Sequence, residues 1–81
     1  MVKVTLIYAK WCNVCPTAMK LWNDLKSKYD FEYEELDLET PEGMALVKEY
    51  SIHSVPTTII DGKVEFIGLP QKLKAAAFVS K

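Results

Sequence analysis

The chain has 81 residues, which is enough for one domain spanning residues 1–81 and too few for two. Hydrophobic residues make up 49% and charged residues 26%, a composition typical of a folded globular domain rather than a disordered chain. The formal net charge is −1, and all ten basic residues are lysines. Because there is neither an arginine nor an excess of positive charge, we expect no nucleic-acid partner.

The chain begins with MVKVTLIYAK, whose short apolar run and lack of a small-residue cleavage site do not fit a signal peptide or a membrane span. The two cysteines are three positions apart, whereas disulfide-dependent secreted domains carry more cysteines, spread over distant loops. We therefore expect a cytoplasmic protein, acting as a monomer and without a membrane partner.

The first half of the chain predicts a strand, a helix and a second strand. Residues 2–8 alternate in polarity and then become apolar on both faces, which is typical of a strand in the middle of a sheet. Residues 13–28 predict a helix, with helical spacing of Val14, Ala18, Leu21, Trp22 and Leu25. Residues 31–38 predict a strand whose alternation changes phase at Glu34 and Glu35, which we interpret as a slip or a bulge.

The second half predicts a short helix, a hairpin and a last helix. Thr40 and Pro41 are typical of a helix start, and the apolar stripe that follows ends near Tyr50. TTIID and KVEFI, joined at Asp61 and Gly62, predict a two-residue hairpin. A third helix of about ten residues is expected to present one apolar face, formed by Leu69, Leu73, Ala76 and Ala77.

The predicted order is thus β-α-β-α-β-β-α. A strand–helix–strand crossover joins parallel strands, and the hairpin adds two antiparallel strands. The expected fold is α/β, with a four-stranded mixed sheet flanked by three helices.

Both cysteines fall in the stretch WCNVCP, residues 11–16, at the turn between the first strand and the first helix. Ligands and chemistry gather at the carboxyl ends of parallel strands, and a helix N-terminus offers free N–H groups and positive potential there. A thiolate is stabilised in such a place, and the thiolate is the attacking species in disulfide exchange. Residues i and i+3 of a first helical turn also have Cα atoms ~5 to 5.5 Å apart, within the span of a disulfide.

Two other interpretations of the pair stay open at this point. The cysteines could be a buried structural pair. They could also ligate zinc together with His53, although this set is one ligand short of a tetrahedral site unless a carboxylate or a second chain completes it.

Two motifs together carry a family resemblance. Residues 8–15, YAKWCNVC, join a strand to a helix, and Ser54-Val55-Pro56-Thr57 enters the third predicted strand about forty residues later. This combination resembles the thioredoxin superfamily, at its small, glutaredoxin-sized end, and the resemblance covers essentially the whole chain.

The resemblance implies a dithiol–disulfide oxidoreductase, an electron carrier that reduces protein disulfides without a cofactor or metal. It implies Cys12 as the nucleophile, Cys15 as the resolving thiol, and Pro56 in cis against the disulfide. Its partners would be a disulfide-containing protein and a recharging reductase of unknown type. Trp11, Val55 and Pro56 would contact the substrate, and five neighbours would surround the site: Lys10, Asn13, Val14, His53 and Thr57.

The sequence departs from the typical family pattern at several places. Asn13-Val14 replaces the Gly-Pro of typical thioredoxins and the Pro-Tyr of typical glutaredoxins, and Leu6 stands where many thioredoxins have a buried acid. Residues 67–71, IGLPQ, contain one glycine and no carboxylate where glutaredoxins usually hold glutathione with a glycine pair and acids. We therefore expect a thioredoxin-like reductant. The alternatives are a glutathione-dependent glutaredoxin and a redox-inactive or metal-linked binding module.

An acidic run over residues 30–42 contains seven of the eleven carboxylates and no lysine. We interpret it as a solvated edge strand that discourages sheet-to-sheet association. The alternative is a surface that selects a basic partner.

Overall fold

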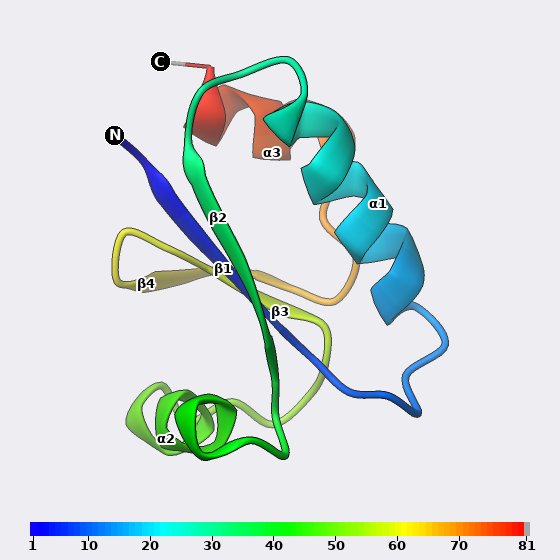
Figure 1. Ribbon diagram of the computed structural model, residues 1–81, viewed down its shortest axis with the longest axis vertical. Coiled ribbons are helices and arrows are strands. Elements are labelled where there is room, and N and C mark those ends of the chain that lie inside the picture. The colour runs from blue at the N-terminus through cyan, green and yellow to red at the C-terminus, as the bar shows by residue number, and fades with distance from the viewer. Residues whose placement is uncertain (81) are drawn as a thin grey trace.

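The computed structural model describes residues 1–80, which form one four-stranded sheet and three helices (Figure 1). The strands are β1 (Lys3–Tyr8), β2 (Glu32–Asp37), β3 (Thr57–Ile60) and β4 (Lys63–Ile67). The helices are α1 (Cys15–Lys26), α2 (Pro41–Glu49) and α3 (Lys72–Val79).

The strand order β2-β1-β3-β4 confirms the predicted mixed sheet. β1 is parallel to β2 and antiparallel to β3, and β4 continues antiparallel beside β3. β1 has a neighbour on each side, and its residues 4–7 are all buried, as its apolar run predicts. β2 is an edge strand, so the acidic run lies along an edge of the sheet.

The helices cover the two faces of the sheet unequally. α1 and α3 pack together over one face, and α2 lies on the opposite side (Figure 1). The main core lies under α1 and α3, around the fully buried Trp22 and Phe31. The indole N–H of Trp22 donates to Thr58 Oγ1 over 3.3 Å, so its one polar group is satisfied.

The prediction of a slip or a bulge in β2 is wrong. β2 pairs with β1 without a break, and the irregularity lies in β4, where Glu65 is skipped between the pairs Thr58–Phe66 and Ile59–Val64. The change of phase has another cause. Near its start β2 packs Tyr33 against Trp22 on the α1 side, whereas Leu38, just after its end, lies with Val47 on the α2 side.

Tyr33, in β2, has a raised pKa. Burial raises the pKa of Tyr33, and its hydrogen bond to the nearby Glu35 carboxylate raises it further, because both favour the neutral hydroxyl.

The first and third helices differ in detail from their predictions. α1 runs over Cys15–Lys26, inside the predicted range of 13–28, with Val14 as its N-cap and Pro16 in its first turn. In α3 the buried residues are Ala75 and Val79, while Leu73 is 81% exposed. The predicted apolar face was therefore wrong. Residues 72–79 are apolar on most sides, so periodicity could not choose the face, and packing against the core chose it.

The hairpin has the predicted two-residue turn, in which Asp61 and Gly62 have φ values of 49° and 82°. Within residues 1–80, no helix is long and apolar enough to cross a lipid bilayer.

Candidate active site

The cysteine motif lies in the connection between β1 and α1. After β1 the chain turns, with the N–H of Cys12 donating to the Ala9 carbonyl over 3.1 Å, and the helix begins at Cys15. Cys12 therefore precedes the helix instead of lying in its first turn. Cys12 and Cys15 are joined as a disulfide with a Cα–Cα distance of 5.5 Å, which agrees with the expected separation.

The two sulfurs occupy different environments. Cys15 is 1% exposed and faces the interior, whereas Cys12 is partly exposed. The backbone N–H of Cys15, in the first turn of α1, donates to Cys12 Sγ over 3.1 Å. That turn contains no acidic residue that would oppose a negative charge. A thiolate on Cys12 would thus be accessible and would be stabilised by the helix N-terminus.

The segment before β3 forms the opposite wall of the site. The Val55–Pro56 peptide bond is cis, Pro56 is buried, and Cys12 Sγ lies 3.8 Å from the Val55 carbonyl oxygen. The Thr57 hydroxyl donates to the Ser54 carbonyl over 2.7 Å, and the Gly68 N–H donates to the Pro56 carbonyl over 2.7 Å. The segment is therefore fixed from both sides.

Val55 is held in place but keeps free hydrogen-bonding capacity. Considering residues 1–80 alone, the backbone N–H of Val55 has no hydrogen-bond partner. An extended peptide lying beside the disulfide could pair with this N–H and with the Val55 carbonyl.

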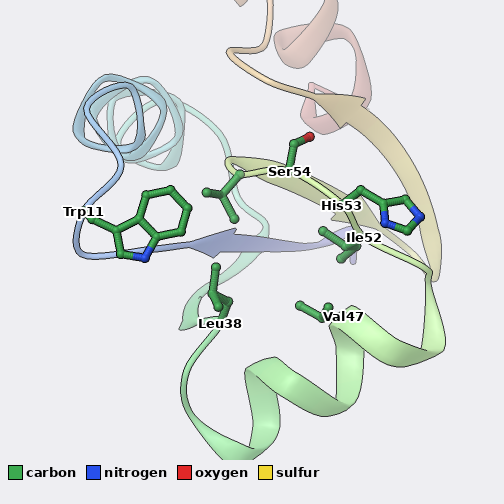
Figure 2. Close-up of a pocket in the computed structure, with 7 residues that line it drawn as sticks. Trp11, Leu38, Val47, Ile52, His53 and Ser54 are labelled. Atoms are coloured by element: carbon green, nitrogen blue, oxygen red, sulfur yellow. The ribbon is translucent and has the colours of Figure 1, made fainter.

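An apolar hollow of about 220 Å³ adjoins the site (Figure 2). Trp11, which is 67% exposed, forms one side of it, and Val55 and Leu38 form others. Val47 and Ile52 close the far side, while the imidazole of His53 points away from Trp11 at the rim (Figure 2). The hollow gives an apolar side chain a place beside Cys12.

Three of these wall residues were not predicted from the sequence: Leu38, Val47 and Ile52. Leu38 directly follows the carboxyl end of β2, and the rule that placed the cysteines at the end of β1 could have found it. Val47 and Ile52 gave no such signal, because only the packing of α2 against the sheet brings them here.

The remaining predicted neighbours have different positions. Lys10, Asn13 and Val14 are exposed around the motif, with Val14 at 45%, whereas Thr57 is buried and holds the segment around Val55. His53 is exposed at the rim. In the part of the chain that the structure describes, no three His, Cys, Asp or Glu side chains are grouped as a metal ion would need. The geometry therefore gives no support to a zinc site at Cys12, Cys15 and His53.

Known proteins resemble this chain in sequence and in structure. A family model described as a thioredoxin domain matches residues 2–80. A thioredoxin of Methanocaldococcus jannaschii is 34% identical over 71 residues, covering 88% of this chain and 84% of that protein. A thioredoxin of Staphylococcus epidermidis is 27% identical over 84 residues, covering 99% and 81%.

Solved structures show the same fold. A mutant thioredoxin from Halobacterium salinarum superposes with a TM-score of 0.81 at 24% identity, covering 98% of this chain and 72% of that one. The oxidized mitochondrial thioredoxin 3 from Saccharomyces cerevisiae gives a TM-score of 0.77 at 23% identity, covering 95% and 76%. With this family match, and with Cys12 and Cys15 paired where a strand meets a helix, the chain belongs to the thioredoxin family and is a dithiol–disulfide oxidoreductase.

Proposed function

We propose that the chain reduces disulfides of partner proteins, with Cys12 as the attacking thiolate and Cys15 as the resolving thiol. The observation that carries this assignment is the asymmetry of the pair. Cys12 is partly exposed and accepts the Cys15 N–H over 3.1 Å, while Cys15 is buried. A partner disulfide can therefore approach Cys12 first.

The reaction consists of two exchanges. The Cys12 thiolate attacks one sulfur of the partner disulfide, so that a mixed disulfide forms and the other partner sulfur leaves as a thiolate. Cys15, deprotonated, then attacks Cys12 Sγ. The Cys12–Cys15 disulfide forms, the second partner sulfur leaves, and both partner thiolates take up protons. Two electrons pass to the partner, and a recharging reductase must return them.

The substrate would be held mainly by its backbone. The Val55 N–H and carbonyl are positioned to pair with an extended partner segment, while Trp11 and Pro56 flank the sulfurs. Main-chain pairing gives affinity without strong sequence selection, as a carrier with several partners would need. We further propose that the chain acts as a monomeric single domain in the cytoplasm, where a dithiol donor is kept reduced. Sedimentation tests the monomeric state, and cell fractionation tests the cytoplasmic location.

The decisive experiment uses the second exchange. In a Cys15→Ser variant the first exchange proceeds and the second cannot, so a mixed disulfide through Cys12 is expected to accumulate. Its partner is identified by mass after non-reducing purification. The matched control is Cys12→Ser, which should trap nothing. Equal trapping by the two variants would reverse or remove the assignment of nucleophile and resolving thiol.

A further inference from the structure

The edge strand β4 is only partly covered. α2 packs against β2, and β3 is buried, whereas β4 is only partly buried and carries the exposed Ile67. The register pairs Thr57 with Ile67 and Ile59 with Val64, which places these four residues on the same face of the sheet. Ile67 is 75% exposed, although it is a large apolar residue.

This face of the sheet has a second hollow, of about 430 Å³. It is lined by residues 50–54 together with Thr57, Val64 and Ile67. The size falls within the range of about 300 to 1,000 Å³ that is typical of ligand pockets. Ile52, Val64 and Ile67 make the lining largely apolar, and no Lys, Asp or Glu belongs to it.

The second hollow adjoins the hollow beside the disulfide site along residues 52–54. Residues 52–54 line both hollows, and Figure 2 shows them at the one beside Trp11. Ile67 directly precedes Gly68, whose N–H donates to the Pro56 carbonyl over 2.7 Å. A partner chain that pairs with Val55 and continues along residues 54 to 52 travels about 10 Å in three residues. It then reaches the second hollow.

We propose that the second hollow binds an apolar side chain, such as leucine, of the disulfide-containing partner, three or four residues from the cysteine that reacts with Cys12. This inference rests on the proposed exchange at Cys12 and deepens it, because it adds side-chain selection to main-chain pairing. The preferred substrates are then disulfides in extended segments with an apolar residue at that distance.

The test is a competition between two peptides on the Cys15→Ser variant. The peptides differ at one position, leucine or serine, placed three or four residues before or after their single cysteine, so that both strand directions are covered. Cys12 is loaded with one peptide as a mixed disulfide, and the other is added as a free thiol. Each exchange breaks one disulfide and forms one, so no oxidant is consumed, and mass spectrometry gives the equilibrium ratio.

We expect the equilibrium to favour the leucine peptide over the serine peptide about five- to tenfold in at least one placement. This is a part of the effect of fully burying a leucine side chain, because the hollow buries the side chain only in part. Adding Val64→Thr or Ile67→Thr to the variant should reduce this preference at least threefold, because each places a hydroxyl in the apolar lining. The matched control is Leu73→Thr, which makes the same kind of change at a residue on α3, over the other face of the sheet. It should keep the preference.

The other outcomes are distinguishable. Equal binding of the leucine and serine peptides in every placement, or a preference that survives both hollow substitutions, overturns the second hollow as a partner site and leaves the exchange at Cys12 intact. If no peptide forms a mixed disulfide through Cys12, the proposed function fails and the inference fails with it.

A second measurement distinguishes a partner peptide from a second copy of the chain. Methyl NMR signals of Val64 and Ile67 that move with protein concentration, but not with the bound leucine peptide, would assign the hollow to a second copy and overturn the proposal.

Discussion

Cys12 differs from Cys15 in exposure and in the backbone N–H that points at its sulfur. We predict that, in the reduced protein, the pKa of Cys12 lies below the ~8.5 of an ordinary thiol, because the N-terminus of α1 favours the thiolate. The pH dependence of alkylation at Cys12, followed by mass, measures this. The rate should stay high well below the pH at which a free cysteine slows. A midpoint of the alkylation rate at the pKa of an ordinary thiol would show that the N-terminus of α1 does not stabilise the Cys12 thiolate.

Thr57 acts on the site through the segment that it holds. Thr57→Val keeps the shape of the side chain but leaves the Ser54 carbonyl without its donor, so we expect the free energy of unfolding to fall by about 1 to 2 kcal/mol. We also expect kcat/KM to fall more for a protein disulfide than for a small disulfide, since only the protein pairs with Val55. Thr57→Ser keeps a hydroxyl and should restore most of the activity. Equal losses for the two substrates would limit Thr57 to a role in stability.

α2 reaches the end of β2 through a glycine. The Gly43 N–H donates to Thr40 Oγ1 over 3.1 Å in the helix cap, and a Cβ at position 43 would overlap the Asp37 carbonyl oxygen and lie 3.0 Å from Leu38 Cα. This close approach fixes how the helix lies against the strand, and therefore where Val47 meets the first hollow.

Two effects of Gly43→Ala oppose each other. Helix propensity favours alanine by about 1 kcal/mol, whereas backbone overlap costs about 1 to 3 kcal/mol or more. Because the overlap is with backbone atoms that cannot move aside, we predict a net loss of about 1 to 2 kcal/mol in the free energy of unfolding, measured by denaturant titration. Ala45→Gly, at an exposed position of the same helix, supplies the propensity effect alone. An alanine variant as stable as the parent would show that α2 can shift on the sheet.

The choice of electron donor involves the whole molecule, because the donor must fit the surface around Cys12. Gly68 is the single glycine of residues 67–71, where Ile67 and Leu69 are exposed and no carboxylate is present. We predict efficient reduction of insulin-type disulfides with a dithiol donor and slow turnover with glutathione. Comparing turnover with the two donors tests this. Fast glutathione-driven turnover would favour the glutaredoxin alternative.

The sequence by itself determined the order of the elements, the mixed sheet and the position of the cysteine motif. These features depend on local patterns: apolar alternation over residues 2–8, helical spacing after Val14, and turn residues at Asp61 and Gly62. A separation of three positions along the chain also limited how far apart Cys12 and Cys15 could lie.

Only the tertiary structure decided which faces are buried and what surrounds the sulfurs. The apolar residues of α3 lie on several sides, so contact with the core selected Ala75 and Val79 over Leu73. The hollows bring together Trp11, Leu38 and Val47 beside Cys12, and Tyr50 and Ile67 beyond it. These residues are far apart in the sequence. Their proximity depends on how the helices and strands pack, and that packing minimises exposed apolar area over the whole chain rather than within one segment.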